Sequence, residues 1–180
     1  RSSTTPPDEW EYHRMSYEYS EDRLVQKTTA EYMEQELGWK SVYAYNTEVL
    51  GERGSLGRMH EGEVVLTRYL LEKLVELNPG HPDEAYQQAI DQLTSTSASK
   101  DLIKSNREMY KLVRDGVRVS YKAADGTKRS PRLRVIDFNE PKNNQFMTVR
   151  ELWVKGMPYR KRPDIIGFVN GIPLLFIELK

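Results

Sequence analysis

Two carboxylates and one amine stand close together near the end of the chain, at Asp164, Glu178 and Lys180. Hydrolysis of a phosphodiester requires positive charge beside the phosphate and a deprotonated water at neutral pH, and Mg²⁺ supplies both. This ion prefers one or two carboxylates, with waters and phosphate oxygens completing its shell. We therefore expect Asp164 and Glu178 to be metal ligands, together with the backbone carbonyl of Leu179. Lys180 would orient or activate the attacking water, or stabilise the developing charge.

These residues terminate two strongly apolar segments. Asp164 precedes the run Ile165–Val169, and Glu178 follows the run Ile172–Ile177. The runs are joined by Asn170-Gly171, the dipeptide most typical of a tight β-hairpin. Because side chains alternate along a strand, Glu178 and Lys180 are expected to share a face. The sequence thus predicts a metal-dependent nuclease centre at the open end of a buried hairpin.

A second set of charges has nearly the same spacing, at Asp125, Glu140 and Lys142. It lies in polar sequence that contains proline and has no apolar strand behind it. A charge at the end of a buried strand is expensive unless it is paired or bound to metal. The apolar context therefore favours the pair at Asp164 and Glu178.

The two carboxylates can share an ion only if the hairpin contains an irregularity. In an ideal two-residue hairpin Asp164 would face Ile177, which puts Asp164 and Glu178 on opposite faces of the sheet. One extra residue corrects this offset. We therefore predict either a three-residue loop with Gly171 in the left-handed conformation or a β-bulge further along one strand.

The basic run Arg160-Lys161-Arg162 immediately precedes Asp164. Taken alone, such a run is typical of a solvated loop. Its position beside the predicted metal site favours contact with the phosphates of DNA instead.

Periodic patterns predict the elements that must position these residues. Helices are predicted over 20–37, 63–77, from 82 onward and over 100–114, and strands over 39–45, 117–121, 132–138 and 146–154. A loop containing four glycines is predicted over 51–62. The fold class is therefore α/β, with helices packed around a mixed, largely antiparallel sheet.

Composition limits the classes of protein. The chain has 180 residues, no cysteine and 27 residues of each charge. This excludes a disulfide framework, thiol catalysis and cysteine-ligated zinc, and it fits a reducing cytoplasm without membrane insertion. Residues 1–14 are polar and read as a disordered lead-in, with Met15 a candidate natural start, which leaves 15–180 as one domain.

The final segment resembles a known nuclease motif. Arg162-Pro-Asp, Asn170-Gly-Ile-Pro-Leu and Glu178-Leu-Lys, in this order, are similar to the motif of the restriction (R) subunit of type I restriction–modification enzymes, in the PD-(D/E)xK nuclease superfamily. The likeness extends upstream to Asn143-Asn-Gln-Phe and to Leu77-Asn-Pro.

This resemblance implies a restriction-endonuclease-like domain, truncated after Lys180, that cleaves double-stranded DNA with Mg²⁺. It also implies an ATP-driven translocase beyond this chain and association with methylation and specificity subunits. In the superfamily a glutamate on the first helix often joins the metal site. Glu21 is the position here that could do so, or it could only complement the helix dipole.

Two alternatives remain open from sequence. One is a stand-alone nuclease of the same superfamily, acting in repair or in modification-dependent restriction. The other is a non-catalytic docking module that keeps the fold. The intact set of Asp164, Glu178 and Lys180 argues against the second, because a purely structural domain does not need unpaired charges at strand ends.

Overall fold

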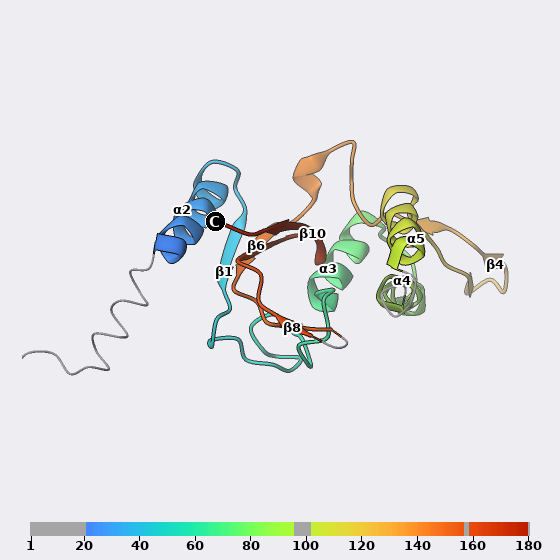
Figure 1. The fold of residues 1–180 in the computed structure, drawn as a ribbon. Coiled ribbons are helices and arrows are strands. Elements are labelled where there is room, and N and C mark those ends of the chain that lie inside the picture. The colour runs from blue at the N-terminus through green and yellow to red at the C-terminus, as the bar shows by residue number, and fades with distance from the viewer. Residues whose placement is uncertain (1–20, 96–101, 157–158, 180) are drawn as a thin grey trace, which may run out of the picture.

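The structure is a computed structural model that describes residues 21–95, 102–156 and 159–179 (Figure 1). The predicted lead-in, residues 1–14, therefore lies outside the described part. The predicted catalytic amine of Lys180 also lies outside it. The described helices are α2 (Glu21–Gln35), α3 (Thr67–Leu77), α4 (Asp83–Ser95), α5 (Leu102–Asp115) and the short 3₁₀ turn η2 (Pro141–Asn143). The strands are β1 (Lys40–Tyr43), β2 (Val117–Arg118), β3 (Tyr121–Lys122), β4 (Lys128–Arg129), β5 (Arg132–Leu133), β6 (Phe146–Arg150), β7 (Val154–Lys155), β8 (Arg160–Lys161), β9 (Ile165–Val169) and β10 (Ile172–Ile177).

A four-stranded sheet lies at the centre, in the order β1-β6-β9-β10. The pair β1–β6 is parallel, and the pairs β6–β9 and β9–β10 are antiparallel. All five residues of β9 are buried, which explains why its sequence is continuously apolar rather than alternating. This mixed, largely antiparallel α/β architecture confirms the predicted fold class.

The elements are spread along the molecule. In Figure 1, α2 and β1 lie at one end, the central sheet and α3 follow, and α4, α5 and β4 lie at the other end. One apolar cluster covers a face of the sheet through Met147, Val149, Ile166 and Phe168. A second contains residues of α4, α5 and β2–β5 together with Val169 and Ile172 at the hairpin. The hairpin therefore connects the two halves of the core.

The distal hairpin follows the prediction in part. Strands pair on either side of the turn at Asp125-Gly126, but the pairing is split into β2–β5 and β3–β4. Pro131, which has no N–H to donate, lies at the break, and the predicted strand over 132–138 ends at Leu133. Helix α4 covers one edge: Gln88 exchanges hydrogen bonds with the backbone of Ser120 at 2.9 and 3.0 Å.

The predicted strand over 146–154 is also too long. β6 ends at Arg150 because Glu151 adopts φ +52°, a left-handed conformation that turns the chain out of the sheet. The predicted helix over 63–77 begins only at Thr67. Just before it, the Leu66 N–H donates to the carbonyl of Gly171 at 2.8 Å. The segment before Thr67 is therefore bonded to the turn of the β9–β10 hairpin and is not part of the helix.

The loop over 51–62 is anchored by a buried arginine. Arg58 has 1% of its surface exposed and forms a two-pronged ion pair with Glu48, at 2.8 and 2.6 Å. The same guanidinium donates to the carbonyl of Trp153 at 3.0 Å, which ties the loop to the chain after β6. In the described part of the chain, the helices are too short or too polar to cross a membrane.

Candidate active site

The β9–β10 hairpin is closed by a two-residue turn. Asn170 and Gly171 have φ of +51° and +80°, the combination of a type I′ turn. A Cβ atom at Gly171 would lie 2.5 Å from the carbonyl oxygen of Leu66 and 2.9 Å from the amide nitrogen of Leu70, so only glycine fits beneath α3. The turn is therefore fixed by chain conformation and by packing.

A β-bulge follows on β10. Pro173 pairs with Phe168 and Leu175 pairs with Gly167, which leaves Leu174 as an extra residue between them. Pairing then continues to Ile177 opposite Ile165. The predicted irregularity is thus confirmed, as a bulge along a strand rather than a three-residue loop.

This bulge changes which residue faces Asp164. Continued by one position, the observed register sets Asp164 opposite Glu178 instead of opposite Ile177. Directly opposed residues share a face of the sheet. The corrected register therefore supports the expectation that the two carboxylates lie on the same side.

Asp164 is half-buried and accepts two hydrogen bonds from neutral donors. Its Oδ1 accepts from Nε2 of Gln26 at 2.7 Å, and its Oδ2 accepts from the backbone N–H of Leu179 at 2.7 Å. Gln26 has 5% of its surface exposed and comes from α2. The contact with Leu179 brings the end of β10 against Asp164. Gln26 was not predicted, because it lies 138 residues away in sequence and belongs to no motif.

The donor set suits a hard divalent cation. Within the described residues neither Asp164 nor the exposed Glu178 forms an ion pair with a basic side chain. Two opposed carboxylates and a nearby carbonyl are the oxygen ligands that Mg²⁺ takes. Groups of three or more histidine or carboxylate side chains placed to hold a metal are absent from the described residues. Glu21 begins α2, but its side chain lies outside the described part.

Buried side-chain amides of two asparagines hold the turn of the hairpin in place. Asn170 is fully buried; its amide donates to the carbonyl of Val135 at 2.8 Å and to Oδ1 of Asn144 at 2.9 Å, and its Oδ1 accepts from the N–H of Gln145 at 2.7 Å. Asn144 also bonds the backbone of Asp137 in both directions. These bonds give a structural reason for the asparagines in the motif: they hold the hairpin turn on the preceding segment.

The basic run is a short strand rather than an open loop. Arg160 forms a two-pronged ion pair with Glu61, one contact being 2.7 Å, and lies 3.7 Å over the ring of Trp153. The Arg160 hydrogen bond is the main cause that holds the pKa of Glu61 below its usual value. Arg162 lies 4.4 Å over Tyr45 and 4.0 Å from Glu151. Lys161 is exposed and makes no ion pair within the described residues.

Glu151 is a second residue that sequence reasoning missed. It is 4% exposed, and its N–H donates to the carbonyl of Asp164 at 3.0 Å. Its side chain turns toward Tyr43, whose hydroxyl lies 3.4 Å from Oε2. A buried carboxylate with positive φ has no signature in the alternating apolar pattern around it.

Comparison with known proteins identifies the family of this chain. The family model described as the type I restriction enzyme R protein N terminus matches residues 18–180. The chain belongs to this family. It is 38% identical over 147 residues to the type I restriction enzyme HindI endonuclease subunit of Haemophilus influenzae. The aligned region covers 81% of this chain and 14% of that protein.

A second member of the family is more distant. A protein of Methanocaldococcus jannaschii named as the type I restriction enzyme MjaIXP endonuclease subunit is 23% identical over 164 residues, covering 89% of this chain and 15% of that protein. The chain thus spans about a seventh of the length of these R-protein relatives.

Proposed function

We propose that this chain is the nuclease part of a type I restriction R subunit and that it hydrolyses phosphodiester bonds of double-stranded DNA with Mg²⁺. The observation that carries the proposal is the bulge at Leu174: continued by one position, the register it creates would set Glu178 opposite Asp164 at the ends of two paired strands. A structural hairpin of this sequence gains nothing from bringing two carboxylates together. Membership of the R-protein family supports this reading over a stand-alone nuclease.

The chain's own residues have distinct roles in this proposal. Asp164 and Glu178 would hold the ion through carboxylate oxygens, and the carbonyl of Leu179 would be a third ligand. Gln26 would fix the rotation of the Asp164 carboxylate, because its amide already bonds Oδ1. When bound, Mg²⁺ would supply positive charge at the phosphate and lower the pKa of a bound water.

Lys180 would act on the water or on the developing charge, not on the metal. Replacing Lys180 with alanine should therefore lower the cleavage rate at saturating Mg²⁺. A raised Mg²⁺ requirement with an unchanged saturated rate would contradict this role.

The rest of the proposal concerns the whole subunit. We infer that an ATP-driven translocase follows this part of the chain and that the subunit works with methylation and specificity subunits. Both inferences rest on the family and on the size of its members.

The decisive experiment compares two exposed glutamates in the full-length subunit, assembled with its partner subunits. Glu178→Gln should abolish cleavage of a DNA plasmid while ATP hydrolysis persists. The matched control is Glu140→Gln, which removes the same charge from the polar segment with similar spacing. Cleavage by Glu178→Gln or by Asp164→Ala at the wild-type rate would refute the metal site.

A further inference from the structure

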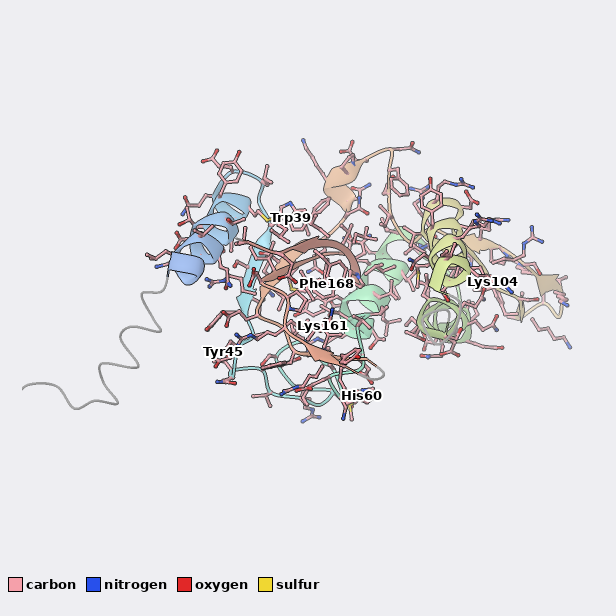
Figure 2. The ribbon with its side chains drawn as sticks, in the orientation of Figure 1. Trp39, Tyr45, His60, Lys104, Lys161 and Phe168 are labelled. Atoms are coloured by element: carbon pink, nitrogen blue, oxygen red, sulfur yellow. The ribbon has the colours of Figure 1, made fainter. Side chains whose placement is uncertain are left out.

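Positive charge is concentrated in one segment of this neutral chain. Between 102 and 134 there are ten basic and three acidic residues, a net charge of +7, so the remaining residues carry −7. This segment comprises α5 and the β2–β5 ribbon, which lie at the end of the molecule away from α2 (Figure 1). In Figure 2, Lys104 of α5 lies on this side of the molecule, and Trp39 lies on the other side, between α2 and the central sheet.

On α5 the cations form a stripe. Lys104, Arg107, Lys111 and Arg114 recur at intervals of three and four residues and are all exposed. This spacing places them on one face of a helix over about 15 Å. The opposite face, which includes the buried Val113, packs into the core. The four basic side chains of the stripe therefore lie on the exposed side of the helix.

The β2–β5 ribbon is polarised in the same way. Four of its inward residues, Val117, Val119, Tyr121 and Leu133, are buried. Arg129, the cross-strand partner of Tyr121, is the exposed exception and is paired with Asp125 at 3.4 Å. The outward positions between them hold only cations and serines: Arg118, Ser120, Lys122, Lys128, Ser130 and Arg132. The two serines meet across the ribbon, with hydroxyl oxygens 3.2 Å apart.

Like charges face each other directly on this ribbon. Arg118 is the cross-strand partner of Arg132, and Lys122 is the partner of Lys128. Directly opposed like charges destabilise a sheet. No acidic side chain within the described residues pairs with Arg118, Lys122 or Lys128. The arrangement costs stability unless an anion lies over the ribbon.

The stripe and the ribbon meet at a hollow of about 380 Å³ that is lined by Arg114, Arg132 and Arg134. Two of these arginines have acidic neighbours, Arg114 with Asp115 at 2.6 Å and Arg134 with Asp137 at 3.0 Å. Because the hollow joins the two elements, their cations form one continuous basic surface: the α5 stripe, the outer face of the β2–β5 ribbon and the hollow.

We propose that this basic surface binds the sugar–phosphate backbone of double-stranded DNA. The cations are spread along an extended surface and do not converge on a point, so they fit a polyanion rather than a single phosphate. A duplex presents about nine phosphate charges along the 15 Å of the α5 stripe, at one per about 1.7 Å. Outward cations and serines contact phosphates and carry no sequence information. The choice of DNA among polyanions rests on the proposed function.

Three matched variants of the full chain test the surface, each losing one arginine and one lysine. Arg118→Gln/Lys128→Gln removes ribbon charge, Arg107→Gln/Lys111→Gln removes helix charge, and Arg53→Gln/Lys142→Gln is the control at exposed positions elsewhere. Affinity for a fluorescent 20-base-pair duplex is measured in EDTA over a range of salt concentrations.

The ribbon and helix variants should each bind about tenfold more weakly and lower the salt slope by about two, because each lost phosphate contact lowers it by about one. The control should bind as the wild type does. Thermal unfolding should show no loss of stability in the ribbon variant, since it removes like-charge repulsion. Affinity equal to that of the control in both variants would overturn the proposal.

Two further measurements separate the alternatives. Polyglutamate that displaces the duplex at equal charge concentration would show an acidic protein partner and overturn the assignment to DNA. Asp164→Ala should keep full DNA affinity in EDTA, so failure of the nuclease proposal and failure of this one give different results.

Discussion

At the open end of the β9–β10 hairpin, Asp164 precedes one strand and Glu178 follows the other, and the register that would align them depends on one extra residue, Leu174. At the other end of the molecule, ten basic residues occur between 102 and 134, and those of the stripe and the ribbon face solvent. A convergent site requires position, because an ion contacts all of its ligands at once. A spread surface requires only net charge on one side. The two regions should therefore respond differently to the same kind of change.

The largest effect is expected from a one-residue insertion. An alanine added after Ile177 moves Glu178 by one position, to the opposite face of the strand. Cleavage by the full-length subunit should fall by roughly 100-fold or more, because misplacement by about 1 Å can have that effect. An alanine added after Gly126, in the turn of the ribbon, should leave both cleavage and duplex affinity unchanged. Wild-type cleavage after the first insertion would show that the register does not build the site.

A smaller effect is expected at the hairpin turn. Asn170→Ala removes three side-chain hydrogen bonds and puts alanine at φ +51°, a conformation that asparagine tolerates better. The free energy of unfolding in urea should fall by about 2–4 kcal/mol. The exposed Asn139, changed to alanine, should alter it by less than about 0.5 kcal/mol. Equal stability of the two variants would contradict a supporting role for the buried amides.

Gln26→Ala tests whether cleavage depends on the orientation of the Asp164 carboxylate. Loss of the amide frees the Asp164 carboxylate to rotate, so cleavage should fall about tenfold and the Mg²⁺ requirement should rise. Duplex affinity in EDTA should not change. The control is Gln35→Ala, the same substitution at an exposed position of the same helix. A Mg²⁺ requirement equal to that of the control would remove Gln26 from the site.

The smallest effect is expected on the ribbon. Lys128→Glu converts the opposed pair with Lys122 into an attractive one, so stability at low salt should rise by about 0.5 kcal/mol. The gain should vanish near 1 M salt, where the Debye length is about 3 Å. Lys142→Glu, outside the ribbon, should give no such gain. Destabilisation by Lys128→Glu would mean that the like-charge pair is not repulsive.

Local sequence patterns determined much of this molecule. The apolar runs before and after Asn170-Gly171 predicted β9 and β10. Parity, combined with the hypothesis of a shared ion, predicted a one-residue irregularity between Asp164 and Glu178, as a three-residue loop or as a bulge. The helical periods of α3, α4 and α5 were also legible, within a few residues at their ends. These features depend on residues close together in the chain, whose conformational preferences and alternation act without the rest of the fold.

Only the tertiary structure decided which distant groups meet. Gln26 reaches Asp164 across 138 residues, and Arg160 pairs with Glu61, which lies 99 residues away in sequence. Glu151 turns β6 aside, and the lysines of the ribbon are set opposite each other by cross-strand register. Such contacts follow from loop closure and packing, which bring together residues whose own neighbours in sequence carry no sign of the pairing.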